Sequence, residues 1–386
     1  MSENRAVFTK FKNRYVIVHI VDSKAEHIYA YDSLSRLEIG TIINCRIDRQ
    51  AGNIGSCFAA YTKNDHAFVQ SDIKSGTVLP LMYKKEAYEN KKSVFSKKLS
   101  ISGKYVIVHE DESFIKASSK IDEETKKEYI ASFEGIIQKA ECGIILRTQV
   151  FNEENGINKA AEEYRMIKNR LEEIRHDSMH LPQYSVLYRP DPAYVSDILW
   201  LIGLGITEIV TDDKEIEAAL NAEHDSLSGP VTLSDRVSTR FYDDKLLPLC
   251  NLYSFNAKIS EVLSRKVYLK SGAFITFDHT EALCAVDVNS SHNDRKGDRN
   301  DTFFSINCEA SVEIARQLKL RNISGMIIID FINMDDDKLY DSLAALLSKE
   351  LKKDRIRCRL IDFTKLHLAE IIRDRKGRSL YSIMGD

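Results

Sequence analysis

Two aspartates occupy places in apolar segments where a carboxylate has a chemical use. Asp287 lies late in the run Cys284-Ala-Val-Asp-Val-Asn-Ser290, and Asp330 lies where Ile327-Ile-Ile-Asp-Phe-Ile332 ends. A carboxylate within strands that bury Val and Ile is costly unless it is paired or bound to a metal. Mg²⁺ takes one or two carboxylates together with waters and substrate phosphate, so the two residues predict a Mg²⁺ site.

Asn289 follows Asp287 by two residues and therefore projects to the same side of an extended chain, where it could share that site. The alternative, in which each aspartate only caps a helix or turns the chain, stays open for either residue taken singly. The histidines form no ligand cluster, and the chain contains no H-E-x-x-H, no Walker-type phosphate loop and no nucleophile elbow.

A second group of residues suits the binding of single-stranded nucleic acid. Phe58 and Phe68 lie in short segments that predict barrel strands, where exposed aromatics stack on bases. The alternative is that both rings belong to the barrel core. Close by is a lysine-rich stretch, opposed only by Glu86 and Glu89, that could follow a phosphate backbone or form an ordinary solvated face: Lys84, Lys85, Lys91, Lys92, Lys97, Lys98 and Lys104.

Composition places the chain among globular proteins of several domains. It has 386 residues, of which 43% are hydrophobic and 29% charged, and 55 basic residues against 58 acidic ones give a net charge of −3. This balance excludes binding of nucleic acid by bulk positive charge, although it leaves room for a local basic groove.

The seven cysteines are odd in number, and none forms a C-x-x-C pair. This excludes a disulfide framework and a zinc site built on a local cysteine pair, and it predicts a reducing compartment. No apolar segment reaches membrane-spanning length and the first residues contain no signal core, so we expect a cytoplasmic protein without a membrane partner.

Changes in hydrophobic period predict the elements that must position these residues. Short strands are expected at 15–21 and 27–31, and a small closed barrel from those at 41–47, 56–61, 67–70, 78–83 and 105–109. An amphipathic helix is expected over 157–174, followed by a helix at 194–203 and a strand at 208–211. The last third alternates strand and helix: strands at 273–277, 282–288, 325–331 and 357–363, and helices at 307–320 and 337–352. Continuous apolarity over 325–331 predicts a strand buried on both faces.

The string Thr280-Glu-Ala-Leu-Cys-Ala-Val-Asp-Val-Asn-Ser290 resembles the catalytic signature of the ribonuclease E/G family. So do the helix that begins at Asn307-Cys-Glu-Ala-Ser311 and the strand Gly325-Met-Ile-Ile-Ile-Asp330. The resemblance is dense over residues 271–379 and looser before them.

The resemblance implies an α/β (α+β) multidomain architecture. It would contain an RNase H-like subdomain in two parts (1–36 and 216–271) and an inserted oligonucleotide-binding barrel of the ribosomal protein S-one type (37–112). A 5′-sensor-like region (113–215) and a deoxyribonuclease I-like catalytic subdomain (272–386) would complete it.

Carried over by position, the resemblance makes Asp287 and Asp330 the Mg²⁺ carboxylates, with Asn289 positioning the scissile phosphate and Arg357 contacting substrate near the metal. The remaining implied roles are stacking by Phe58 and Phe68 and contact with a 5′-monophosphate by Arg147 and Thr148. Within the lysine-rich stretch, Lys97 and Lys98 are the predicted RNA contacts.

Three departures from the family pattern bear on these roles. Asn333 replaces an aspartate, and the segment Gln149-Val-Phe-Asn-Glu-Glu-Asn155 replaces a glycine-containing loop, which weakens the expectation of 5′-end sensing. The given sequence ends at Gly385-Asp386, before any zinc-binding C-P-x-C link, so we expect a monomer or a zinc-independent homodimer.

The favoured hypothesis is a Mg²⁺-dependent endoribonuclease that cuts single-stranded RNA, in rRNA or mRNA processing or decay, to 5′-phosphate and 3′-hydroxyl ends. The rival is an RNA-binding protein that keeps the fold and cleaves weakly or not at all. A phosphoesterase acting on small molecules is a third, which the barrel and the lysines disfavour.

Overall fold

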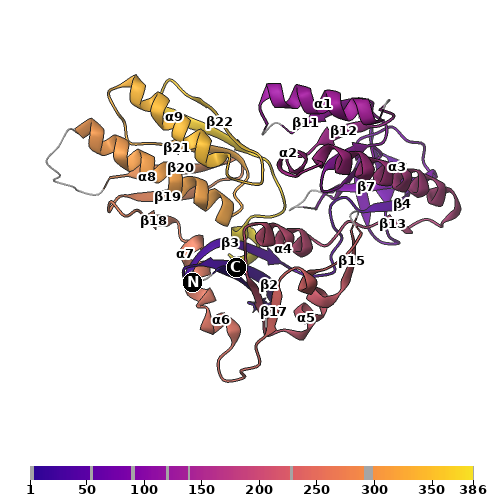
Figure 1. The fold of residues 1–386 in the computed structure, drawn as a ribbon, viewed down its shortest axis with the longest axis horizontal. Coiled ribbons are helices and arrows are strands. Elements are labelled where there is room, and N and C mark those ends of the chain that lie inside the picture. The colour runs from indigo at the N-terminus through magenta and orange to yellow at the C-terminus, as the bar shows by residue number, and fades with distance from the viewer. Residues whose placement is uncertain are drawn as a thin grey trace. The chain divides into compact units, whose positions relative to one another are not determined.

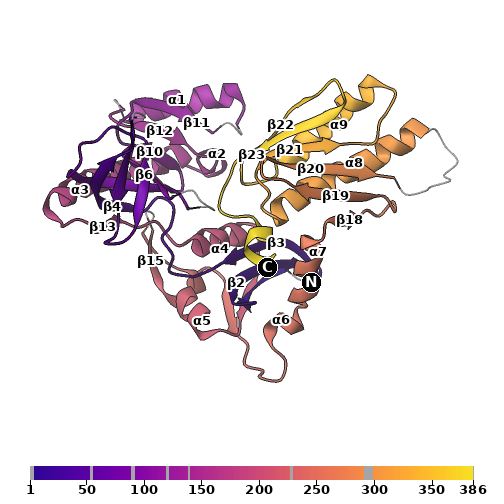
Figure 2. The same ribbon diagram turned by 180° about the vertical axis from the view of Figure 1, so that it is seen from behind.

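The computed structural model describes residues 4–52, 55–87, 92–118, 121–137, 140–226, 229–290 and 299–385, and no side chains between 223 and 231. The chain forms two compact units. The first comprises Met1–Leu34, Asp197–Asn221 and Leu233–Asp386, and the second comprises Ser35–Ser196 and Ala222–Thr232. Figure 1 shows the elements of each unit, and Figure 2 shows them from behind.

The first unit contains a five-stranded sheet in the order β17-β14-β1-β2-β3. Its strands are β1 (Asn4–Phe11), β2 (Arg14–Val21), β3 (Lys24–Tyr31), β14 (Glu208–Thr211) and β17 (Ser238–Phe241). The turns between β1, β2 and β3 use two residues each with positive φ, as tight antiparallel hairpins require. Helices α7 (Phe255–Leu263) and α10 (Leu380–Met384) pack on its apolar face.

The second sheet of this unit has six strands in the order β18-β19-β20-β21-β23-β22. These are β18 (Lys266–Tyr268), β19 (Phe274–His279), β20 (Leu283–Asn289), β21 (Gly325–Asp330), β22 (Cys358–Phe363) and β23 (Leu368–Arg373). Strands β20 and β21 are parallel, and α8 (Arg299–Leu320) lies between them in the chain. Residues of α8 and of α9 (Asp337–Leu351) form one core with the inward side chains of the strands.

The prediction that strand 325–331 is buried on both faces is wrong. Along β21, the side chains of Ile327 and Ile329 are fully buried. The side chain of Met326 is 52% exposed, and Asp330 is exposed as well. The alternation arises because both helices pack into the core on one side of the sheet. The strand also has apolar side chains on its other face, so its sequence is continuously apolar although only one face is buried.

The second unit contains the predicted closed barrel. Strand β4 (Ile42–Gln50) pairs with β5 (Cys57–Ala60) and also with β7 (Val78–Lys85), so the circuit β4-β5-β6-β8-β7 closes on itself. The remaining barrel strands are β6 (His66–Val69) and β8 (Val94–Ser96). Strand β13 (Val186–Tyr188) pairs antiparallel with β4 and is not part of the circuit. The fold is thus mixed α/β with a five-stranded barrel, as predicted at this level.

A four-stranded sheet accompanies the barrel, in the order β11-β12-β10-β9. Its strands are β9 (Ser100–Ser102), β10 (Val106–His109), β11 (Phe114–Ala117) and β12 (Gly143–Leu146). The predicted strand at 105–109 belongs here and not to the barrel. Helices α1 (Glu123–Ile137), which the sequence analysis did not predict, and α3 (Gly156–His180) share its core, and the short α2 (Gln149–Asn152) lies between them.

The other helices are short. Helix α4 (Ala193–Gly203) crosses the division between the units, and α5 (Lys214–Asn221) and α6 (Leu249–Leu252) belong to the first. Strands β15 (Glu223–Ser226) and β16 (Gly229–Thr232) form a two-stranded antiparallel sheet. Among the described residues, no helix combines the length and the apolarity needed to cross a membrane.

Candidate active site

Asp287 and Asp330 are direct neighbours across two parallel strands. They pair in register between β20 and β21, whose backbones lie about 4.8 Å apart in any sheet. Both residues stand near the carboxyl ends of their strands, the edge at which open α/β sheets bind ligands. The prediction that the two residues share a site therefore agrees with the register.

The expectation that the two carboxylates are buried is wrong. Val286, Val288 and Ile329 point into the core, and the period of two turns the intervening Asp287 and Asp330 to the exposed face. The strands bury apolar side chains on one side only, so both carboxylates remain accessible to solvent.

Electrostatics nevertheless single out this pair. Burial, followed by the negative charge of Asp287, raises the pKa of Asp330. The amide Nδ2 of Asn289 donates to the carboxylate Oδ2 of Asp287 at 2.5 Å, as their spacing on β20 allows. Asn289 thus orients the Asp287 carboxylate, and the charge of that carboxylate disfavours the ionised form of Asp330. A bound cation would favour that ionised form.

The donor set fits Mg²⁺. Two carboxylates and an amide are hard oxygen ligands, and Mg²⁺ completes its shell with water and phosphate. Within the described ranges, no three His, Cys, Asp or Glu side chains converge as a closed metal cluster. Two carboxylates and an amide leave most coordination positions of a cation to water and phosphate, as Mg²⁺ binding does, whereas structural zinc takes four protein ligands.

The loop that follows Asp330 is fixed by Asn307, a residue that the sequence analysis did not select. Asn307, on α8, is 0% exposed. Its Nδ2 donates to the carbonyl of Ile332 at 2.8 Å, and its Oδ1 accepts from the backbone N–H of Ile332 at 3.1 Å. Tyr340 accepts from the N–H of Met334 at 3.1 Å. Its position could have been recognised in the sequence, because Asn307 is an amide residue on the apolar face of a predicted amphipathic helix.

Arg357 is not brought to the carboxylate pair. It directly precedes β22, whose first residue Cys358 pairs with Arg373, and Arg373 pairs with Gly325 at the start of β21. Asp330 lies five residues further along β21, about 16 Å at the usual rise per residue. Substrate contact by Arg357 stays a prediction. The residue itself lies at the edge of the sheet opposite to the two aspartates.

The two barrel phenylalanines face outward. Phe58 and Phe68 pair in register on β5 and β6, with ring centroids 5.9 Å apart at 69°. Both are half-buried, whereas their neighbours in sequence point into the barrel core. The guanidinium of Arg49 lies 5.2 Å from the Phe58 ring centroid, and the ammonium of Lys92 lies 5.4 Å from it. Neither ring therefore belongs to the barrel core, and stacking on bases stays a prediction.

Two lysines of the lysine-rich stretch are paired with carboxylates from other parts of the chain, which reduces the positive charge of this surface. Lys98 pairs with Glu112 at 2.9 Å, and Lys104 pairs with Glu153 at 2.8 Å, which lowers the pKa of Glu153 to about 2. Lys97 is exposed, and Lys91 lies outside the described residues. Both acidic partners are distant in sequence, so a local count of charges could not include them.

Arg147 and Thr148 belong to the second unit. The Arg147 guanidinium donates to the carbonyl of Gly103, and burial lowers the pKa of that guanidinium. Thr148 donates its hydroxyl to that of Ser118 at 3.4 Å. The two residues are adjacent just after β12, and their contact with a 5′-monophosphate stays a prediction.

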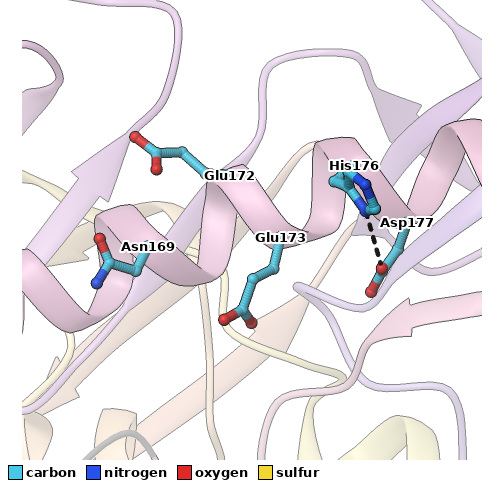
Figure 3. A pocket seen from close by; sticks show the side chains of 5 residues that line it. All are labelled: Asn169, Glu172, Glu173, His176 and Asp177. Carbon is cyan, nitrogen blue, oxygen red and sulfur yellow. Dashed lines mark ion pairs between the residues drawn. The ribbon is translucent and has the colours of Figure 1, made fainter.

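The hollow shown in Figure 3 lies on α3 and contains none of the predicted site residues. Its lining consists of Asn169, Glu172, Glu173, His176 and Asp177. Three carboxylates would repel a phosphate, so we do not assign this hollow to nucleic acid.

Comparisons with known proteins connect these features. The model of the "Ribonuclease E/G family" matches residues 100–376. Ribonuclease E of a Nostoc species is 29% identical over 290 residues, which cover 75% of this chain and 41% of that protein. Ribonuclease E of Escherichia coli is 28% identical over 83% of this chain and 30% of its own length.

Ribonuclease G of Salmonella typhimurium is 39% identical over 137 residues, or 36% of this chain and 28% of that protein. The chain thus spans less than half the length of these relatives. The match to this relative is shorter and higher in identity than the two matches to ribonuclease E.

Proposed function

Because the chain belongs to the ribonuclease E/G family, we propose that it is an endoribonuclease that cuts single-stranded RNA to 5′-phosphate and 3′-hydroxyl ends. The observation that carries the proposal is the register pairing of Asp287 with Asp330 at the carboxyl edge of their strands. We place its substrates among rRNA and mRNA, and its compartment in the cytoplasm.

Asp287 and Asp330 would hold Mg²⁺, and Asn289 would orient the Asp287 carboxylate and position the scissile phosphate. When bound, Mg²⁺ supplies an activated water and stabilises the charge that develops on the phosphate. The protein's own contribution is to keep the side chains that would bind Mg²⁺ in fixed positions. Asn307 does so for the loop after β21, and the sheet ladder does so for both aspartates.

The outward rings of the barrel would bind the RNA strand. Phe58 and Phe68 offer stacking faces, and Arg49 and Lys92 beside them supply positive charge for the phosphates. The RNase H-like and deoxyribonuclease I-like subdomain assignments belong to this proposal and rest on the family.

Replacement of Asp330 tests the proposal. We expect Asp330→Asn to lower the rate of Mg²⁺-dependent cleavage of a labelled single-stranded oligonucleotide by roughly a thousandfold, because a metal ligand is lost. Binding of the same oligonucleotide should change little. The matched control is Asp341→Asn, which alters an exposed aspartate on α9 and should keep the parent rate. Parent-like cleavage by Asp330→Asn, or no Mg²⁺-dependent product from the parent, would contradict the assignment.

The rival function, RNA binding without efficient cleavage, is favoured by one observation. Arg357, expected beside the metal, lies at the other edge of the sheet. Oligonucleotide binding by the parent without any product at saturating Mg²⁺ would support the rival.

Arg147 and Thr148 remain proposed contacts for a 5′-monophosphate. A cleavage assay with 5′-monophosphate, 5′-triphosphate and 5′-hydroxyl substrates tests them. Equal rates on the three substrates would remove both residues from the proposal.

A further inference from the structure

The carboxyl edge that holds Asp287 and Asp330 also holds two hairpin turns. One joins β18 to β19, whose first residue Phe274 pairs with Asn289. The other joins β22 to β23, whose first residue Leu368 pairs with Asp330. Each turn places an exposed lysine at this edge, Lys270 in the first and Lys365 in the second.

The two turns have the same backbone pattern. In the first, the N–H of Leu269 donates to the carbonyl of Ala273, and that of Gly272 donates to Leu269. In the second, the N–H of Thr364 donates to Leu368, and that of His367 donates to Thr364. The fourth residue of each turn is left-handed, with φ of 90° at Gly272 and 60° at His367. The lysine is the second residue of each.

Side-chain contacts hold both turns in place. The carboxylate of Glu309 accepts from the backbone N–H of Lys270 at 2.7 Å and from that of Ser271 at 3.3 Å. The ring of His367 stacks on Tyr340, with centroids 4.3 Å apart. Each lysine therefore extends from a preset backbone, which reduces the entropy lost when it binds an anion.

The sheet order places the turns symmetrically about the aspartates. The sequence of strands β18-β19-β20-β21-β23-β22 puts β20 and β21 at the centre, with a hairpin on each side. The middle of each hairpin is two strand spacings from the midpoint between the aspartates, or about 10 Å. An extended RNA strand whose scissile phosphate lies at the aspartates would pass both lysines, one on each flank.

The charges of these lysines are available to a ligand. Among the residues that the structure describes, neither ammonium lies within 4.0 Å of a carboxylate, whereas Arg265 of the same sheet pairs with Asp278 at 2.5 Å and Lys353 with Glu350 at 2.6 Å. Two cations beside a carboxylate pair suit a ligand whose charge is repeated, as in a nucleic-acid backbone.

We propose that Lys270 and Lys365 bind RNA phosphates on opposite sides of the scissile phosphate, one upstream and one downstream. The inference rests on the proposed function and adds the direction of the RNA, which crosses the strands along their carboxyl edge. The lysines are binding residues that act on ground state and transition state alike, so they affect KM more than kcat.

The salt dependence of binding is the first test. We measure the affinity of the full chain, with Asp287→Asn to prevent cleavage, for a labelled single-stranded oligonucleotide over a series of salt concentrations. Each of Lys270→Met and Lys365→Met should reduce the slope of log K against log salt by about 0.7, and the double variant by about 1.4. Lys→Arg at either position should restore the slope.

The matched control is Lys352→Met, which removes an exposed lysine at the opposite edge of the same sheet, just after α9. Its slope should equal that of the parent. In the cleaving chain, each edge lysine variant should raise KM roughly three- to tenfold with little change in kcat.

Truncated substrates test the direction. An oligonucleotide without nucleotides upstream of the cleavage site should become insensitive to one lysine variant, and one without downstream nucleotides should become insensitive to the other. Sensitivity of both variants to the same flank, or a slope unchanged in both, would overturn the proposal and leave the lysines as solvated surface. Cleavage by the parent is measured first, so a failure of the endoribonuclease assignment is recognised separately.

Discussion

At the scale of single residues, the paired imidazoles of His19 and His27 show how hydrogen positions follow from neighbouring groups. The Nδ2 of Asn4 donates to the carbonyl of Gly205 at 2.9 Å, so its Oδ1 accepts from Nε2 of His19 at 2.8 Å. The Nδ1 of His19 must then accept, and it does so from Nδ1 of His27 at 3.1 Å. This chain of hydrogen bonds requires the His19 ring to be neutral and places a proton on Nδ1 of His27.

The pKa values agree with that requirement. Burial lowers the pKa of His19. Burial, the neighbouring His19 and the cations Lys319, Arg355 and Arg316 lower the pKa of His27 to about 3. In the unfolded chain each ring has its ordinary value near 6.5. Between these values the unfolded state binds more protons, so stability falls as pH falls.

We therefore expect acid to destabilise the protein in part through His27. Between pH 7.5 and pH 5, the unprotonated ring of the folded state should account for a loss of about 2 kcal/mol in unfolding free energy. Denaturant unfolding at several pH values measures this loss. His27→Phe keeps a ring that can stack on Tyr29 and cannot be protonated, so its dependence on pH should be shallower. An equal dependence in variant and parent would contradict the argument.

Phe58 allows a second prediction at this scale. We expect Phe58→Ala to weaken the binding of single-stranded oligonucleotide by about 1–3 kcal/mol, because a stacking face is lost. Phe58→Tyr should bind nearly as well as the parent. Titration of a fluorescent oligonucleotide measures both, and Phe95→Leu in the barrel core serves to separate lost stacking from a damaged barrel. Parent-like affinity of Phe58→Ala would remove the platform from the proposed function.

Residue types and strand periods carried the prediction of Asp287, Asn289 and Asp330, because sequence spacing fixes which side of a strand a residue occupies. The same reasoning could not place Arg357. Its distance from the aspartates depends on β23, an unpredicted strand that separates β21 from β22. Nor could it show that the helices leave one face of the sheet open, which decided the exposure of both carboxylates.

At the scale of elements, helix α8 links the sheet to the loop that follows Asp330. The helix was predicted from its apolar period over 307–320, but it starts earlier, at Arg299. Its polar residues Asn307 and Glu309 hold backbone groups at the carboxyl edge, one beside Asp330 and one in the β18–β19 turn. Helical periodicity predicts where such a helix lies, whereas the partners of its buried amide depend on loops whose shape periodicity does not describe.

We expect Asn307→Leu to destabilise the protein by about 2–4 kcal/mol, because it leaves the N–H and the carbonyl of Ile332 without their partners. The rate of cleavage should fall as well, since the loop after Asp330 loosens. Denaturant unfolding and the oligonucleotide assay measure the two effects. The control Ser311→Ala removes one 2.9 Å hydrogen bond to the carbonyl of Asn307, and should cost no more than about 1 kcal/mol. Equal stability of Asn307→Leu and the parent would show that the loop does not need this clamp.

At the scale of the whole molecule, each compact unit contains its own apolar cores. Phe255 belongs to a core of the first unit and Phe95 to a core of the second, and both are almost completely buried. The predicted domain limits stay a prediction, and the predicted region 113–215 contains residues of both units. Sequence periodicity could not show which segments combine, because a unit of three separate segments leaves no local mark at its divisions.

We expect the two units to unfold in separable transitions. Phe95→Ala should destabilise the second unit, and Phe255→Ala the first, by about 3–5 kcal/mol each. Differential scanning calorimetry of each variant should show a lower midpoint temperature for one transition and an unchanged midpoint for the other. The transition that shifts should differ between the two variants. A single transition that shifts equally in both variants would mean that the units unfold together.

The pairing of β1 with β14 has a consequence during protein synthesis. Arg5 of β1 pairs with Glu208 of β14, and the core over β1 and β2 includes Leu380 and Met384. Ribosomes add about 5–20 residues per second, so β1 waits about 10–40 s for its parallel partner. The segment Ser35–Ser196 emerges in that interval and has a complete core of its own. The nascent chain can therefore fold this segment first, while the edge of β1 that later pairs with β14 is unpaired and open to aggregation.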